Sequence, residues 1–179
     1  MPRLTGWQKA FKKIEKEGDK QIRILYGSAA LALFRYWGIK QVAIERTFDV
    51  SLDIWQKCAK DKDRSMIAMC EEETRIEVQN GEGKSWHDLP YLNGKDTGPM
   101  TEAQLIYMRN QQVKWVAPQI MSCILMAMHQ KHGFGYERCA RFYGQIQEIR
   151  DEYRMDPKRI RTACIEETGI DVAKIAKGG

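Results

Sequence analysis

Three histidines are the first side chains to consider for chemistry. His129 and His132 lie three residues apart at the end of an apolar segment, and Cys139 follows them, so imidazole and thiolate groups could together bind zinc. The pattern has neither the glutamate of a zinc-hydrolase helix nor a second pair of cysteines. We therefore expect no metal ion and no cofactor.

Carboxylates next to a histidine or to one another are the second candidates. His87 precedes Asp88, but adjacent side chains in a loop usually point apart, and no Gly-x-Ser-x-Gly turn marks a nucleophile. The acidic runs at 71–73 and 166–167 would face different sides of a helix, as solvated residues do. Glycine motifs for phosphate binding are missing from the sequence. We interpret the chain as not an enzyme, with a metal-dependent enzyme as the second alternative.

Basic side chains are the stronger candidates, and they form two groups. In the first group lysines recur at the helical period, opposite Trp7, Ala10, Phe11 and Ile14. The second group surrounds the turn before the last long helical pattern. Both suit contact with phosphates or with an acidic protein surface. The predicted binding residues are Lys9, Lys12, Lys13, Lys16, Lys20, Arg150, Arg154, Lys158, Arg159 and Arg161.

Two observations keep other interpretations of these groups open. Glu15, Glu17 and Asp19 flank the lysines, so a solvated helix face explains the row equally well. Neither half of the chain has the glycine-containing turn that marks the recognition helix of a helix-turn-helix protein. Direct binding of DNA or RNA is therefore the first alternative to binding of a protein.

The elements that position these residues are repeated along the chain. At an offset of 95 residues Gly38 corresponds to Gly133 and Ile44 to Cys139. At an offset of 94 the segment 72–78 corresponds to 166–172, and at 96 the pair Thr5 and Gln8 corresponds to Thr101 and Gln104. Repeats of this kind indicate a duplicated structural unit.

Each repeat has the pattern of successive helices. The threonine–glutamine pairs predict capping boxes at the start of the first helix. An apolar helix over 22–37 or 120–132 follows and ends at Gly38 or Gly133, and Pro118 either starts the second of these helices or kinks a continuous one. An amphipathic helix comes next. A short last helix starts at Asp156 and Pro157 and ends at Gly169.

The fold expected from these patterns is all-α, with two tandem diverged units of three to four helices packed as one body with pseudo-two-fold symmetry. Helices that are apolar on nearly all sides are normally buried, so we expect the two apolar helices to pack together. The units cover 1–78 and 100–179. A glycine- and proline-rich linker covers 79–99, in which Trp86 and Tyr91 are candidate contact residues. Arg75 stands where the second unit has Gly169, which predicts a frayed or continued helix end.

Composition indicates in which cellular compartment the protein works and to which class of protein it belongs. The chain has 179 residues, 43% hydrophobic and 30% charged, with a net charge of +5 that lies mainly in residues 1–23. Five cysteines at apolar helical positions read as buried, reduced thiols. The N-terminus lacks the pattern of a signal peptide, and the longest apolar stretch is too short to span a bilayer. We expect a soluble cytoplasmic protein without a membrane partner.

The second half also resembles a family. From Thr101 through 129–143 (HQKHGFGYERCARFY) to 165–172 (IEETGIDV), it is similar to small, uncharacterised helical proteins of phages and prophages of Firmicutes. The resemblance covers about 75 residues and implies a phage accessory protein. Such proteins often act on host nucleoprotein machinery, as anti-CRISPR inhibitors do. The expected function is a non-enzymatic binding protein that inhibits or modulates a nucleic-acid-processing or defence complex of the bacterial host, with a protein or ribonucleoprotein as partner.

Overall fold

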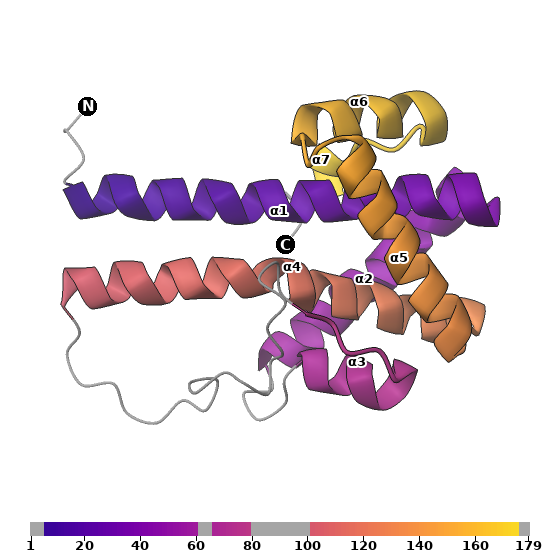
Figure 1. Ribbon diagram of the computed structural model, residues 1–179, viewed down its shortest axis with the longest axis horizontal. Helices are drawn as coiled ribbons and strands as arrows, with labels where there is room; N and C mark the ends of the chain where they lie inside the picture. The colour runs from indigo at the N-terminus through magenta and orange to yellow at the C-terminus, as the bar shows by residue number, and fades with distance from the viewer. Residues whose placement is uncertain (1–5, 61–65, 80–100, 176–179) are drawn as a thin grey trace.

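The computed structural model describes residues 6–60, 66–79 and 101–175 (Figure 1). All regular secondary structure in these ranges is helical, which confirms the all-α class. The helices are α1 (Gly6–Trp37), α2 (Gln41–Lys60), α3 (Met66–Thr74), α4 (Glu102–His132), α5 (Tyr136–Glu152), α6 (Pro157–Thr168) and α7 (Val172–Ile175). None of the described helices is long and apolar enough to cross a membrane. The predicted linker, with Trp86 and Tyr91, lies outside the described residues except for Gln79.

Two long helices form the centre of the molecule. Helix α1 has 32 residues and α4 has 31, so in each case the predicted opening segment and the predicted apolar segment form one helix. Pro118 lies inside α4 rather than at its start. Ser122 lies one turn after Pro118, and its hydroxyl donates to the Pro118 carbonyl oxygen at 2.9 Å. Of the two expectations for Pro118, the continuous helix is the one observed.

The short helices of each half cover the long helix of the other half. Helices α1 and α4 lie side by side and run in the same direction (Figure 1). Helices α2 and α3 pack mainly on α4, whereas α5 and α6 pack mainly on α1. Each half therefore completes the core of the other.

The core lies where the C-terminal parts of α1 and α4 meet. Every residue over 24–33 and over 120–128 is buried, as expected for helices that are apolar on nearly all sides. The inward stripes of the amphipathic helices join this core, with Ile44 and Phe48 from α2 and Phe142 and Ile146 from α5. All five cysteines are buried thiols, as predicted.

Glycine ends both long helices in the way the sequence predicts. Gly38 and Gly133 have φ of 64° and 63°, a left-handed conformation that glycine adopts without steric cost. The amides of Gly38 and Gly133 donate to the carbonyls four residues earlier, at 3.2 and 3.0 Å. The next amides, of Ile39 and Phe134, donate to the carbonyls of Leu33 and Met128, so a further carbonyl at the end of each helix has a partner.

The end of α3 differs from the prediction. Arg75 neither frays nor continues the helix, because its φ is 60° and its amide donates to Glu71 O at 2.8 Å. Gly169 at the end of α6 has φ of 76° and makes the same bond to Ile165 at 3.0 Å. Ile76, which follows Arg75, is buried. We attribute the left-handed turn to the burial of this following segment, which requires the chain to reverse at Arg75.

The threonines that precede these two ends make matching hydrogen bonds. Thr74 Oγ1 donates to Cys70 O, and Thr168 Oγ1 donates to Cys164 O, both at 2.7 Å. Each hydroxyl then accepts from the amide two residues on, Ile76 at 3.3 Å and Ile170 at 3.2 Å. The ends of α3 and α6 therefore have the same arrangement of hydrogen bonds.

Helix starts in the second half confirm the predicted caps. Thr101 Oγ1 accepts from the Gln104 amide at 3.3 Å, and the Thr101 amide donates to Gln104 Oε1 at 2.8 Å, which is a complete capping box. Asp156 accepts from the amides of Lys158 and Arg159, with Pro157 in the first turn of α6. The corresponding box at Thr5 lies outside the described residues.

Candidate basic interface

The first basic group lies on the N-terminal part of α1. Lys12, Lys13, Lys16 and Lys20 are exposed, and nothing is described of the Lys9 side chain. On the opposite side Ile14 is buried, as the helical period predicts. A Cβ on Gly18 would lie 3.9 Å from Val113 of α4, so the two helices approach closely here.

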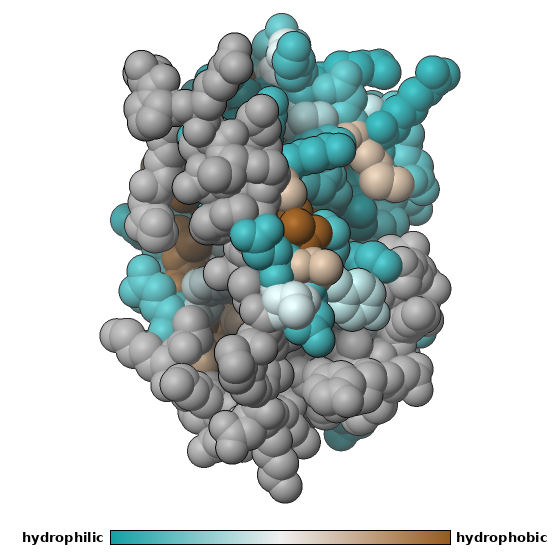
Figure 2. Space-filling model, turned by 90° about the vertical axis from the view of Figure 1, so that its left-hand side faces the viewer, coloured by the Kyte–Doolittle hydropathy of each residue, from teal (hydrophilic) through white to brown (hydrophobic). Residues whose placement is uncertain are grey.

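This part of α1 extends beside the start of α4, away from the short helices (Figure 1). Figure 2 looks onto that end of the molecule and shows hydrophilic side chains around a small apolar area. One lysine of the row is paired, because Lys20 Nζ lies 3.6 Å from Glu17. The row is therefore exposed but includes nearby acidic groups.

The second basic group lies on α5, on α6 and in the turn between them. One of its members, Arg161, is paired with a carboxylate of the same chain. Its Nε and Nη2 donate to the two carboxylate oxygens of Asp171, each at 2.7 Å. This bidentate pair lowers the pKa of Asp171 to about 2. The charge of Arg161 is thus balanced by its own chain.

Arg150 is also largely engaged. Its side chain is half-buried, and Nη1 donates to Gln147 Oε1 at 2.7 Å. Nη2 lies 3.8 Å from the sulfur of Met155, and Nε is buried without a hydrogen-bond partner among the described residues. Burial lowers the pKa of this guanidinium, since a charged group is less stable away from water.

The other three cations of this group are exposed. Arg154 lies in the turn between α5 and α6, and Lys158 and Arg159 lie in the first turn of α6. The described part of the chain places no carboxylate in an ion pair with any of them. The Arg159 guanidinium lies over the ring of Tyr153, 5.8 Å from its centroid. We call Arg154, Lys158 and Arg159 the basic turn.

The backbone of the basic turn is strained. Arg154 and Met155 both have φ of 51°, a left-handed conformation that costs residues other than glycine about 1–3 kcal/mol each. Their amides donate to Asp151 O at 2.9 Å and to Arg150 O at 2.8 Å, which closes the end of α5. The sequence predicts a turn here but not its left-handed backbone, because the turn contains no glycine.

Arg35 holds α5 and α6 in place on α1. Its Nε donates to Glu167 Oε2 at 2.7 Å and its Nη2 to Glu167 Oε1, so the pair is bidentate. Nη1 donates to Glu152 at 2.9 Å, and Nη2 also donates to the Tyr153 hydroxyl at 2.7 Å. The bonds with Glu167 raise the pKa of Arg35 and lower that of Glu167. The basic turn therefore stands on a rigid support.

The histidines considered for zinc make hydrogen bonds within the fold. His129 Nδ1 donates to Phe134 O at 2.8 Å, and Cys139 Sγ lies 3.6 Å from the same oxygen. Thr47 donates its hydroxyl proton to Ala43 O, so it accepts from His132 Nε2 at 2.8 Å. Over the described ranges, no group of three His, Cys, Asp or Glu residues is placed to hold a metal ion.

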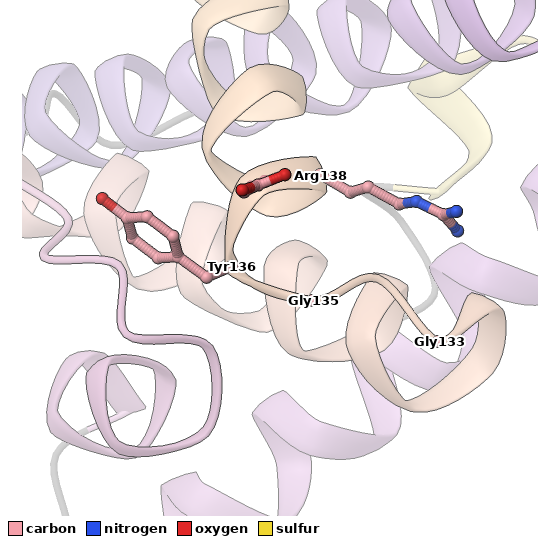
Figure 3. Close-up of a pocket in the computed structure, with 5 residues that line it drawn as sticks. Gly133, Gly135, Tyr136 and Arg138 are labelled. Carbon is pink, nitrogen blue, oxygen red and sulfur yellow. The ribbon is translucent and has the colours of Figure 1, made fainter.

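A shallow hollow lies at the start of α5. It is lined by Gly133, Gly135, Tyr136, Glu137 and Arg138. Figure 3 shows Tyr136 and Arg138 pointing in opposite directions. Because these side chains do not converge on one point, the hollow offers no defined binding geometry.

Comparison with known proteins adds no identification. No family model, no curated protein and no solved structure matches this chain.

Proposed function

We propose that this chain is a non-enzymatic, phage-encoded binding protein that inhibits or modulates a nucleic-acid-processing or defence complex in the cytoplasm of its bacterial host, as anti-CRISPR proteins do. One observation carries the proposal: the basic turn presents Arg154, Lys158 and Arg159 to solvent without carboxylate partners in the described structure. Such a surface is complementary to phosphates or to acidic side chains. The resemblance of the second half to phage proteins supports the proposed origin.

Rigidity supports the same interpretation. Binding is stronger when the contact residues are already ordered, since less entropy is lost on association. The turn is fixed at both ends, by the α5 carbonyls and by Asp156, and Arg35 joins both helices to α1. A surface held in this way can act by occupying a site on a larger complex.

The test is co-purification from the natural host at low salt. The tagged full-length chain is compared with the triple variant Arg154→Gln, Lys158→Gln, Arg159→Gln. The control variant Lys12→Gln, Lys13→Gln, Lys16→Gln removes the same charge from the exposed row on α1. We expect a nucleoprotein complex to be retained by the wild type and the control and lost by the triple variant. Absence of a nucleoprotein partner, or its retention by the triple variant, would contradict the proposal.

A regulator that binds DNA or RNA directly through the lysines of α1 is the second candidate. It is favoured by the exposure of Lys12, Lys13, Lys16 and Lys20 on the part of α1 that extends away from the short helices. Such binding would weaken steeply with salt, because neutralised phosphates release counterions. Reversing the charge of Lys12, Lys13 and Lys16 should abolish it. Unchanged affinity for nucleic acid would remove the lysine row from this function.

We also infer that the chain arose by duplication and folds with pseudo-two-fold symmetry. The matching bonds of Thr74 and Thr168, and the way each half covers the long helix of the other, support this. Separate expression of 1–99 and 100–179 tests the shared core. We expect each piece to be poorly folded alone and the mixture to recover cooperative helical melting. Two independently stable pieces would contradict the shared core.

A further inference from the structure

Helices α5 and α6 have the layout of a helix-turn-helix unit. Four residues, Tyr153 to Asp156, connect a 17-residue helix to a 12-residue helix. The two helices run in clearly different directions, and α1 packs against both (Figure 1). Helix-turn-helix units join their helices by three or four residues, often including glycine. Here Arg154 and Met155 adopt the left-handed backbone that glycine would otherwise supply.

The solvent-exposed face of α6 carries a row of side chains that a partner could contact. Ile160, Ala163, Cys164 and Thr168 point into the core, which fixes the opposite side of the helix toward solvent. On that side Lys158, Thr162 and Ile165 recur at spacings of four and three residues, and all are exposed. This row extends over about 10 Å, since each helical residue rises about 1.5 Å. Ile165 is 41% exposed, so this row presents an apolar side chain to solvent beside Lys158 and Thr162.

We infer that α6 is a recognition helix that enters the major groove of duplex DNA, with Arg154 and Arg159 of the basic turn against the phosphate backbone. This inference rests on the proposed function and names the component of the complex that the chain contacts. The major groove is wide enough to admit an α-helix, and the first residues of a recognition helix make its base contacts. Lys158 and Thr162 can bond to base edges, and Ile165 can contact a thymine methyl group. Arg154 and Arg159 can neutralise phosphates on either side of the groove.

The positive charge on the α6 face favours DNA over an apolar partner. The same comparison restricts the proposed contact to the second half of the chain. The N-terminal end of the α6 face carries Lys158 and Arg159, while its only exposed carboxylate, Glu166, lies at the far end. In α3 the residues that correspond to Ile165 and Glu166 are Glu71 and Glu72, which would repel phosphates. The described residues of the first half therefore do not form a matching face, and we expect one duplex per chain.

The first measurement is binding of the full-length chain to a fluorescein-labelled, random-sequence duplex, followed by anisotropy between about 50 and 200 mM salt. We expect Arg154→Gln with Arg159→Gln to lower the affinity about tenfold or more and to reduce the salt slope by about 2. Lys12→Gln with Lys13→Gln removes the same charge and should leave the affinity within about twofold. Arg161→Gln should also have little effect, because that charge is already paired with Asp171.

The second measurement distinguishes groove insertion from general attraction. Thr162→Glu places a carboxylate in the middle of the exposed face without touching the core, so its melting temperature should stay unchanged while duplex binding falls by more than about tenfold. Methyl green, which occupies the major groove, should compete with the wild type. Netropsin, which occupies the minor groove, should not.

Three outcomes would overturn the inference: equal affinity for single-stranded RNA of the same length, an equal loss in the Lys12 and Lys13 control, or competition by netropsin alone. Failure of this inference can be told apart from failure of the proposed function. If the chain has no affinity for duplex DNA but still retains a host complex after nuclease treatment, α6 does not enter DNA and the partner is a protein. If neither is observed, both proposals fail.

Discussion

Arg35, near the end of α1, donates two hydrogen bonds to Glu167, near the end of α6, across 132 residues of sequence. The same guanidinium reaches Glu152 and Tyr153 at the end of α5. Both helices that flank the basic turn are therefore fixed to α1 by one side chain. Four predictions follow from this contact and from the packing around it.

Replacing Arg35 with Met should destabilise the protein and loosen α5 and α6. The change leaves the part-buried Glu167 carboxylate without its bidentate partner and the exposed Glu152 without its ion pair, so we expect a loss of about 2–3 kcal/mol, or several degrees in melting temperature. Circular dichroism melting measures the loss. Arg161→Met is the control, since its pair with Asp171 is exposed, and its shift should be much smaller. Equal shifts would show that Arg35 does not anchor the two helices.

The contribution of Glu167 should depend on pH. Its pKa is lowered by the bonds from Arg35, so its stabilisation is complete above the ordinary carboxylate pKa and is lost as the pH falls through the lowered value. The melting temperatures of wild type and Glu167→Gln should differ at pH 7 and converge in acid. A difference that stays constant from neutral to acidic pH would contradict this account.

Gly27→Ala should destabilise the contact between α1 and α6. A Cβ at Gly27 would lie 2.5 Å from Ile160 Cγ2, so the helices must separate. Overpacking of this kind costs about 1–3 kcal/mol. Gly144→Ala in α5 is the matched control, because a Cβ there meets no atom within 4 Å and alanine favours a helix by up to about 1 kcal/mol. Denaturant melts should therefore move in opposite directions for the two variants.

The two left-handed helix ends should respond oppositely to exchange of their residues. Arg75→Gly relieves the backbone cost at φ of 60°, and we expect a gain of up to about 1 kcal/mol. Gly169→Ala adds that cost, and its Cβ would also lie 2.9 Å from Gln41 Oε1. Thermal melting of both variants tests the pair. If Arg75→Gly lowered the melting temperature, the side chain of Arg75 would contribute more than its backbone costs.

Features that depend on neighbours along the chain were predictable from the sequence. The capping box at Thr101, the cap at Asp156 and the glycine stops at Gly38 and Gly133 each involve bonds within about six residues. The buried stripes of α2 and α5 follow from the helical period. These features depend only on neighbours along the chain, so the sequence is enough to predict them.

Only the tertiary structure decided how these elements act on one another. The sequence does not show that Arg161 pairs with Asp171, that Arg35 reaches Glu167, or that each half covers the long helix of the other. It also predicted the wrong helix end at Arg75 and did not predict the backbone conformation of Arg154 and Met155, because non-glycine residues adopt a left-handed backbone there. A contact between distant residues depends on where the fold places both of them, and a strained backbone persists only when the surrounding packing holds it.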